Sequence, residues 1–369
     1  MRNATALVLM LGSVVALGCE DEKKTVAPAP SSSAATAASA PMPSASAAPK
    51  LSMPEMQAAT MKVLLDGANK HDAKLVASAY APEAVVKAPG TPDVTGRAAI
   101  EADRVKLYTG VPDGKLAIGR VWQKGNTEAV EWAFTGTNTG EWMGQKATGR
   151  PIGGNGLSIY VFNDAGLIVE QRRYMDIPTL QSQMDPKAKA GTFRAIPTLP
   201  TATETHVAKD DEATLKQANA MYAAFDSHKP ADFMAFVTDA TVYDDYTLPA
   251  QAKGTKAIKD VYASYLTAFP DFKQTYPLQI VADGYVVTEG ILTGTNKGAI
   301  GPFKASNKPV TLHFVDVFQL KDSKIVSGVT YMNSQELLTQ IGAVPAPGAV
   351  PSASAAASAA QPAPKASPK

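Results

Sequence analysis

The spacing of apolar residues in the first half of the chain is helical at the start and strand-like further on. Ser52-Met53-Pro54-Glu55 is a capping-box sequence, with a proline just inside the helix that it begins. Met56 and Leu64 then fall on one helical face. The pattern predicts a short second helix after His71 and a third helix after Gly96.

Beyond these helices the pattern becomes that of strands. β-Branched and aromatic residues are enriched in four runs, at residues 116–122, 128–138, 157–162 and 167–176. Turn sequences such as Lys124-Gly125-Asn126 separate the runs. Helices followed by a meander of strands predict an α+β unit, in which the helices lie on one side of an antiparallel sheet.

The same order of elements occurs a second time. Tyr174-Met175-Asp176 returns as Tyr331-Met332-Asn333, at an offset of 157 residues. The Thr-Gly-Thr-Asn sequence at residues 135–138 returns at residues 293–296, at an offset of 158 residues. The chain is therefore predicted to contain two tandem copies of one folded unit.

A chain of 369 residues is long enough for two hydrophobic cores. A strongly curved sheet around a helix leaves a cone with a closed tip and an open mouth, which suits a small-molecule pocket. We therefore predict two cone-shaped α+β domains, at residues 51–187 and 209–342, with a linker at residues 188–208. Asp210 or Asp211 is expected to cap the first helix of the second domain.

The N-terminus has the features of a targeting segment. Arg2 supplies a positive charge, and residues 4–17 form an apolar run too short to span a membrane as a helix. Gly18 then precedes Cys19, which is the only cysteine in the chain. This arrangement resembles a bacterial lipoprotein signal, which implies removal of residues 1–18 and lipidation of the Cys19 thiol. The alternative is an ordinary secretory signal with an incidental cysteine.

Two further segments are rich in alanine, serine and proline. They lie at residues 19–50 and 343–369. Their composition offers too little large apolar surface to offset the entropy of ordering, so we expect a disordered tether and a disordered tail. With the lipidated cysteine, this predicts a protein anchored in the cell envelope, at the periplasmic face of the inner or outer membrane or at the cell surface.

Charge and motif content exclude several classes of function. Lysine and arginine number 35 against 34 aspartates and glutamates, so no basic surface for nucleic acid is predicted. The sequence has no cluster with metal-ligand spacing, no Ser-His-Asp arrangement and no glycine-rich phosphate loop. We therefore expect neither a metal nor a cofactor.

Several short motifs in the first copy point to a known family. They are Gly136-Thr137-Asn138-Thr139-Gly140, Ala147-Thr148-Gly149-Arg150, Gly166-Leu167-Ile168-Val169-Glu170, and Asp176 followed by Leu180 and Gln183. Together they make residues 52–184 resemble the SnoaL-like polyketide cyclase (ester cyclase) branch of the nuclear transport factor 2-like superfamily. The second copy keeps the first turn and the ending, but Ser327 stands where Glu170 stands in the first, and Asn333 replaces Asp176.

The resemblance implies a chemical role for Asp176. In these cyclases an aspartate at this position acts as acid and base in an aldol cyclisation, and a carboxyl group in an apolar cone can have a pKa raised toward neutrality. A helix N-cap before residues 177–183 is an equally natural role, and Asn333 would cap as well. The histidine that the cyclases place in the pocket has no clear counterpart, since His71 is expected on the surface and His313 alternates in facing with Asp316.

Candidate ligand-binding residues come from the strands around Asp176. Side chains alternate along a strand, so Glu170, Arg172, Tyr174 and Asp176 share one face of the last strand. We predict that this face contacts the ligand, although a structural ion pair between Glu170 and Arg172 is an alternative. The full predicted set is Glu131, Trp132, Tyr160, Glu170, Arg172, Tyr174, Tyr331 and Asn333.

Three functions stay open from the sequence. The first is a lipoprotein that binds a small apolar or carbonyl-containing molecule in the first cone. The second is a cofactor-independent enzyme of the cyclase, isomerase or hydratase kind that uses Asp176. The third is a structural or assembly role, in which the open sheet faces pair the two copies internally or form a homodimer. The predicted location in the cell envelope and the absence of a clear counterpart to the cyclases' pocket histidine favour binding over catalysis.

Overall fold

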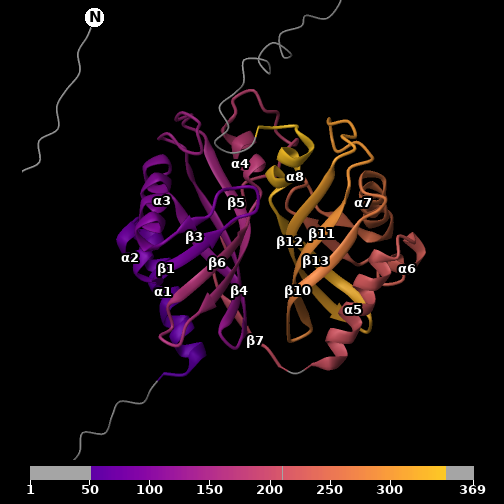
Figure 1. Ribbon diagram of the computed structural model, residues 1–369, viewed down its shortest axis with the longest axis horizontal. Coiled ribbons are helices and arrows are strands. Elements are labelled where there is room, and N and C mark those ends of the chain that lie inside the picture. Colours follow the sequence, from indigo (N-terminus) through magenta and orange to yellow (C-terminus); the bar gives the residue numbers. More distant parts are fainter. Residues whose placement is uncertain (1–50, 210, 346–369) are drawn as a thin grey trace, which may run out of the picture. The chain divides into compact units, whose positions relative to one another are not determined.

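The computed structural model describes residues 51–209 and 211–345 (Figure 1). The predicted signal segment, Cys19 and the tether up to residue 50 lie outside the described residues, as do Asp210 and the predicted tail from residue 346 onward. Within the described part, no helix combines the length and the apolar character needed to cross a membrane.

The first domain consists of helices on one side of a seven-stranded open sheet. Its helices are α1 (Met53–Lys70), α2 (Ala73–Ser78), α3 (Arg97–Gly110) and α4 (Ile177–Met184). Its strands are β1 (Tyr80–Lys87), β2 (Val94–Thr95), β3 (Lys115–Lys124), β4 (Thr127–Thr137), β5 (Pro151–Phe162), β6 (Ile168–Tyr174) and β7 (Glu204–Val207). The strand order is β2-β1-β6-β5-β4-β3-β7.

The second domain repeats this plan with six strands. Its helices are α5 (Glu212–Asp226), α6 (Pro230–Met234), α7 (Gly254–Ala268) and α8 (Ser334–Ile341). Its strands are β8 (Val242–Asp245), β9 (Ala252–Lys253), β10 (Lys273–Ala282), β11 (Tyr285–Thr295), β12 (Pro309–Lys321) and β13 (Lys324–Met332). The strand order is β10-β11-β12-β13-β8-β9. Two tandem α+β domains are thus confirmed.

The expected sheet type is wrong in one respect, because both sheets are mixed. The meander strands pair antiparallel, but β1 runs parallel to β6 and β8 runs parallel to β13. The sequence pattern missed β1 and β8, which precede the long helices α3 and α7. A further parallel strand, β7, pairs with β3 and lies inside the segment that was expected to be a linker.

Local sequence signals explain where the helices begin. The Glu55 carboxylate accepts a hydrogen bond from the Ser52 backbone N–H at 2.7 Å, which completes the predicted capping box of α1. Asp211 accepts from the Thr214 backbone N–H at 2.9 Å and caps α5. The helices then bury apolar residues such as Leu64 against the inner face of the sheet.

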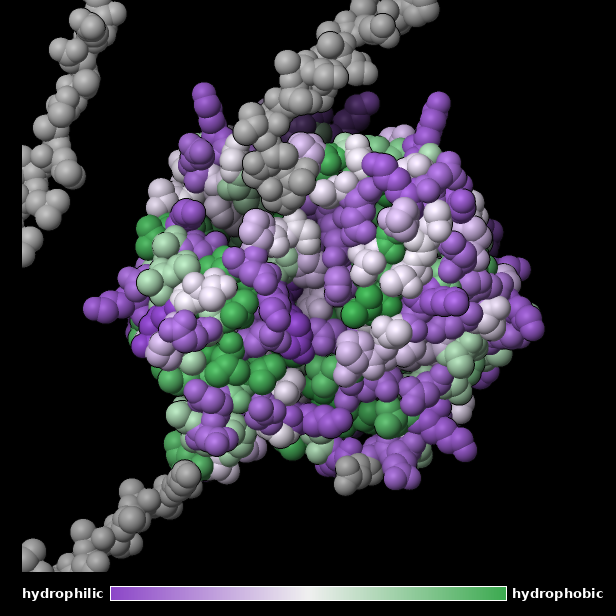
Figure 2. Space-filling view, in the orientation of Figure 1, coloured by the Kyte–Doolittle hydropathy of each residue, from purple (hydrophilic) through white to green (hydrophobic). Residues whose placement is uncertain are grey.

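The outer faces of the two sheets share one hydrophobic cluster. Its members from the first domain are Trp122, Ala129, Leu157, Ile159 and Tyr174, and those from the second are Ile280, Ala282, Val287, Val315, Val317 and Tyr331. Burial of apolar surface is the main favourable term in the packing of the two sheets against each other. The visible face of the molecule, by contrast, is mostly hydrophilic, with small hydrophobic groups between the polar side chains (Figure 2).

Candidate functional site

The helices and the inner sheet face of the first domain border an open-mouthed cavity of about 780 Å³. Its wall is mainly apolar and is supplied by α1, α2, α3 and the sheet. The apolar lining includes Leu64, Val76, Val86, Leu107, Val111, Leu116, Trp132, Phe134, Trp142 and Met175. A mainly apolar wall with a few polar groups is the usual composition of a small-molecule site.

A hydrogen-bonded network lies on the sheet side of this cavity. The Tyr80 hydroxyl donates to Oε1 of Gln171 at 2.6 Å, and Nε2 of Gln171 donates to Ser158 Oγ at 3.0 Å and to Tyr160 Oη at 3.2 Å. Burial raises the pKa of both Tyr80 and Tyr160, so both hydroxyls stay neutral. The network fixes the side chains of three elements around the cavity.

Two arginines bring positive charge into the same cavity. Arg104 extends from α3 and Arg173 from β6. The nearest carboxylate oxygen to Arg104 belongs to Asp103, at 3.8 Å from Nη2, which is too long for a strong ion pair. The Arg173 guanidinium forms no hydrogen bond or ion pair with any described residue, and burial together with the charge of Arg104 lowers its pKa.

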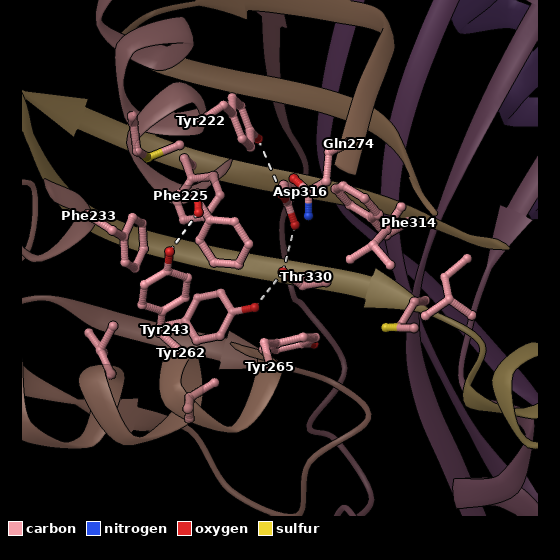
Figure 3. Close-up of a pocket in the computed structure, with 17 residues that line it drawn as sticks. Tyr222, Phe225, Phe233, Tyr243, Tyr262, Tyr265, Gln274, Phe314, Asp316 and Thr330 are labelled. Carbon is pink, nitrogen blue, oxygen red and sulfur yellow. Dashed lines mark hydrogen bonds between the residues drawn. The ribbon is translucent and has the colours of Figure 1, made fainter. Parts of the chain in front are cut away.

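The second domain has a much smaller cavity, of about 70 Å³. Aromatic rings fill the space, and Figure 3 shows them clustered around Asp316. Asp316 accepts hydrogen bonds from Thr330 Oγ1 at 2.6 Å and from the Tyr222 hydroxyl at 3.2 Å, while the Tyr243 hydroxyl lies 2.8 Å from Thr330 Oγ1. Burial raises the pKa of Asp316 to about 7.

Of the predicted ligand-binding residues, Trp132 and Tyr160 line the first cavity. The residues of β6 that border it are Gln171 and Arg173, with Met175 just beyond the strand. These belong to the face opposite the predicted one. The predicted face of the last strand turns toward the second domain instead, and it also carries polar residues.

The predicted residues Glu170, Arg172 and Tyr174 lie on that outer face. Arg172 and Tyr174 border a separate cavity of about 370 Å³ that also involves Glu289 of the second domain. Glu170 pairs with Lys87 at 2.6 Å. The geometry gives these residues no contact with the large cavity, and their part in ligand binding stays a prediction.

Two glutamates connect the domains through equivalent contacts. Glu131 accepts a hydrogen bond from the Tyr331 hydroxyl of the second domain at 2.8 Å. Glu289, at the matching position of β11, accepts from the Tyr174 hydroxyl of the first domain at 2.6 Å and from Arg172 Nε at 2.6 Å. Both carboxylates are buried, so these charge-assisted contacts fix how the two sheets pack.

Asp176 and Asn333 form reciprocal helix caps. Asp176 caps its own helix α4 by accepting from the Thr179 N–H at 3.0 Å, and it accepts from the Ser334 N–H, at the start of α8, at 2.9 Å. Asn333 caps α8 and accepts from the Ile177 N–H, at the start of α4, at 3.1 Å. Both Asp176 oxygens are thus engaged, and burial raises its pKa. Its acid–base role stays a prediction without support from this placement.

Two of the four histidines contact backbone carbonyl groups, and the other two, His206 and His313, contact the carboxylates of Asp283 and Glu336. Nε2 of His71 lies 2.8 Å from the Gly114 carbonyl oxygen, and Nε2 of His228 lies 2.9 Å from that of Phe272. His71 was expected on the surface, but it is half-buried and borders the large cavity. Among the described residues, no group of three or more histidine, cysteine, aspartate or glutamate side chains is placed to hold a metal ion.

The motif residues shape the loop at residues 138–150. Buried Asn138 donates to the Gly140 carbonyl at 2.8 Å and accepts from the Thr148 N–H at 3.0 Å. A Cβ atom on Gly140 would lie 2.2 Å from the Thr109 carbonyl oxygen, so only glycine fits there. Trp142 of this loop borders the cavity, and the motif therefore supports its wall.

Sequence reasoning missed Arg104, Tyr108, Gln171 and Arg173. A signal was present, since Arg104 and Tyr108 are four residues apart and therefore lie on one face of α3. The two copies also differ at these places. Tyr262 of α7 stands where Arg104 stands, and Thr330 stands where Arg173 stands.

The sequence model described as SnoaL-like polyketide cyclase matches residues 58–184 and 216–341, which together exceed half of the chain. No curated protein matches the chain. Among solved structures, TsrD from Streptomyces laurentii is 23% identical with a TM-score of 0.33, over 37% of this chain and 98% of that one. IdmH from Streptomyces antibioticus is 26% identical with a TM-score of 0.31, over 35% and 97%. A protein with a ketosteroid isomerase-like fold from Catenulispora acidiphila, in complex with trimethylamine, is 20% identical with a TM-score of 0.31, over 37% and 98%.

Proposed function

Because the chain belongs to the SnoaL-like polyketide cyclase family, we propose that the cavity of its first domain binds a small molecule with a largely apolar body. The observation that carries the proposal is the cavity itself. Its volume of about 780 Å³ and its apolar wall with convergent polar side chains match the usual properties of ligand sites.

The second domain has a different part in this proposal. Its cavity of about 70 Å³ is smaller by an order of magnitude and is packed with aromatic side chains. We assign it to packing, so that one of the two duplicated cones binds and the other supports it. This division agrees with the different residues at matching positions of α3 and α7.

Binding is best tested with a neutral fluorescent probe, Nile red, on the chain from Cys19 onward. Ala68 borders the cavity from α1, so Ala68→Phe should fill part of it and weaken binding at least about tenfold. Ala102→Phe is the matched control, because Ala102 lies on the exposed side of α3. Equal affinities for the parent and both variants would place the probe elsewhere and remove support for the proposal.

The alternative function, based on family membership, is a cyclase- or isomerase-type reaction. Its proposed acid–base group is Asp176, whose two oxygens are engaged in helix caps. If co-purifying ligands are identified by mass spectrometry, turnover by the parent and by Asp176→Asn can be compared directly. Equal turnover by the two proteins would end the proposed role of Asp176.

We also propose an envelope location, through lipidation of Cys19. The support is the sequence at residues 1–19, an apolar run that closes on a glycine and the chain's only cysteine. Fractionation of cells that express the Cys19→Ala variant tests it. The expected result is loss of the protein from the membrane fraction, and retention there would contradict the anchor.

A further inference from the structure

We infer that the ligand of the first cavity is an amphipathic organic acid, whose single carboxylate is bound between Arg104 and Arg173. This inference rests on the proposed function of the same cavity and adds the class of ligand to it. The apolar wall would hold the body of the acid, and the two guanidinium groups would hold its head.

The two arginines have fewer polar partners than buried cations usually have. Nε of Arg104 is buried and has no hydrogen-bond partner among the described residues, and the side chain as a whole is only 14% exposed. Arg173 borders the same cavity, and Asp103 is the one acid whose charge acts on both guanidinium groups. Two largely buried cations that share one distant carboxylate are incompletely neutralised, so the site can accept an anion.

A third unpaired donor lies beside them. The hydroxyl of Tyr108 is buried and has no partner among the described residues, and burial raises its pKa, so it keeps its proton. Tyr108 follows Arg104 by one turn of α3, and both side chains border the cavity. Two residues on one face of α3 thus border the cavity, and each has a buried donor without a partner among the described residues.

The charged residues that border the cavity favour a ligand with one negative charge. The lysines and arginines that border the cavity are Arg104, Lys106, Lys115 and Arg173, and the acids are Asp93, Asp103 and Glu141. Four positive charges against three negative ones leave an excess of one. A carboxylate would balance it, and two arginine forks offer the planar donors that a carboxylate accepts.

The second domain provides an internal comparison. Tyr262 and Thr330 replace the two arginines there, and buried Asp316 stands where the first domain has Ser158. The inner face of the second cone thus carries an acid and no arginine at these positions. The pair of cations is specific to the cone that has room for a ligand.

The experiment is isothermal titration calorimetry of the chain from Cys19 onward with three probes that share one tail: decanoate, decan-1-ol and decyl phosphate. We expect decanoate to bind at least about tenfold more tightly than decan-1-ol, because charge-assisted hydrogen bonds add to the apolar contact. Decyl phosphate distinguishes the kind of anion, and binding tighter than that of decanoate would contradict the match to a single carboxylate.

Variants separate the head-group contact from the cavity. Arg104→Met and Arg173→Met should each weaken decanoate binding about tenfold or more and leave decan-1-ol within about threefold. Lys74→Met is the matched control, because exposed Lys74 carries the same charge outside the cavity. Melting curves show that the variants fold, and loss of a cation without a close ion-pair partner should not lower the melting temperature.

The outcomes distinguish failure of the inferred ligand class from failure of the proposed binding function. If decan-1-ol and decanoate bind equally and both are weakened by Ala68→Phe, the cavity binds ligands but the inference about the acid is wrong. If neither probe nor Nile red binds, the proposed function fails as well. If Lys74→Met weakens decanoate as much as Arg173→Met does, the effect is general electrostatics and the inference is wrong.

Discussion

At the scale of single residues, a few substitutions separate two cones that share one fold. Arg173 and Thr330 occupy matching positions, and so do Ser158 and Asp316. In the first cone a neutral hydroxyl faces an arginine, and in the second a carboxyl group is enclosed by hydroxyl donors. The chemistry of each interior is therefore set by residues that the fold does not require.

Asp316 should make the stability of the second domain depend on pH. Its pKa is about 7 in the folded protein against 3.8 when unperturbed, so the folded state holds the proton more tightly than the unfolded chain does. The free energy of unfolding should therefore fall as the pH rises from about 4 to about 7, by on the order of 4 kcal/mol at most. Urea unfolding of Asp316→Asn across this range should show a clearly shallower fall.

Glu128 of the first domain is the matched comparison, because burial raises its pKa to about 7 as well. Glu128→Gln should also reduce the pH-dependent fall in the free energy of unfolding. The reductions in the two single variants should add in the double variant, because the two groups lie in different domains. An undiminished fall in Asp316→Asn would contradict the protonated state assigned to that carboxyl group.

At the scale of elements, helix ends in one domain are completed by residues of the other. Asp176 and Asn333 each satisfy a backbone N–H at the start of the partner domain's helix as well as one in their own helix. The first N–H groups of a helix have no partner within the helix, so these contacts matter most where they are buried. The replacement of aspartate by asparagine keeps an oxygen acceptor at both places.

Asp176→Ala should therefore cost more stability than the loss of one cap. We expect the free energy of unfolding to fall by about 2 kcal/mol, against about 1 kcal/mol for an ordinary N-cap. Asp72→Ala is the control, since Asp72 caps α2 through the Leu75 N–H at 2.9 Å within one domain. Probe binding in the cavity should be unchanged in both variants. Loss of binding with unchanged stability in Asp176→Ala would instead favour a role at the ligand.

The sequence predicts the helices better than the site for a physical reason. Capping and helical spacing are local, so Ser52 and Asp211 mark their helices from sequence alone. A strand period of two shows that residues 170 and 171 face opposite ways, but it does not show which side is the interior. In β6 both faces are polar, because one borders a cavity and the other contacts a second domain.

The outer face of the sheet is the second reason why the site is harder to predict from the sequence than the helices are. Glu131, Arg172 and Tyr174 have the residue types of a ligand site, yet each bonds a residue more than a hundred positions away in the chain. Glu131 and Arg172 also have local partners, Arg120 and Glu170, and the second of these is the ion pair named as an alternative from the sequence. No local pattern identifies such partners. The repeat was the one available signal, since Glu131 and Glu289 occupy matching positions and bind matching tyrosines across the two domains.

At the scale of the whole molecule, the two domains pack through a hydrophobic cluster with polar contacts around it. Trp122 and Leu157 of the first sheet and Val287 and Val315 of the second are fully buried within this cluster. The homodimer that the sequence also suggested stays a prediction. The described chain already buries, by contacts within itself, these apolar outer-face residues of both sheets.

Removal of an interface carboxylate should weaken the connection between the domains. Glu289→Ala leaves the Tyr174 hydroxyl without its partner and Arg172 with Glu170 alone. Loss of one partner from a buried ion pair costs about 3–5 kcal/mol, and the remaining Glu170 contact should place the cost at or below the lower end. Differential scanning calorimetry should show one transition for the parent and a lower, broadened or split transition for the variant. Glu83→Ala, at an exposed position of β1, is the control and should behave as the parent does.

The central claim is that the first cone, and no other cavity of the described chain, receives the ligand. A crystal structure of the protein soaked with 10-bromodecanoate tests it directly, because the anomalous signal of bromine locates the bound tail. We expect bromine within the cavity lined by Trp132 and Phe134, and a carboxylate between Arg104 and Arg173. Bromine beside Arg172 and His313, or among the aromatic rings around Asp316, would contradict it.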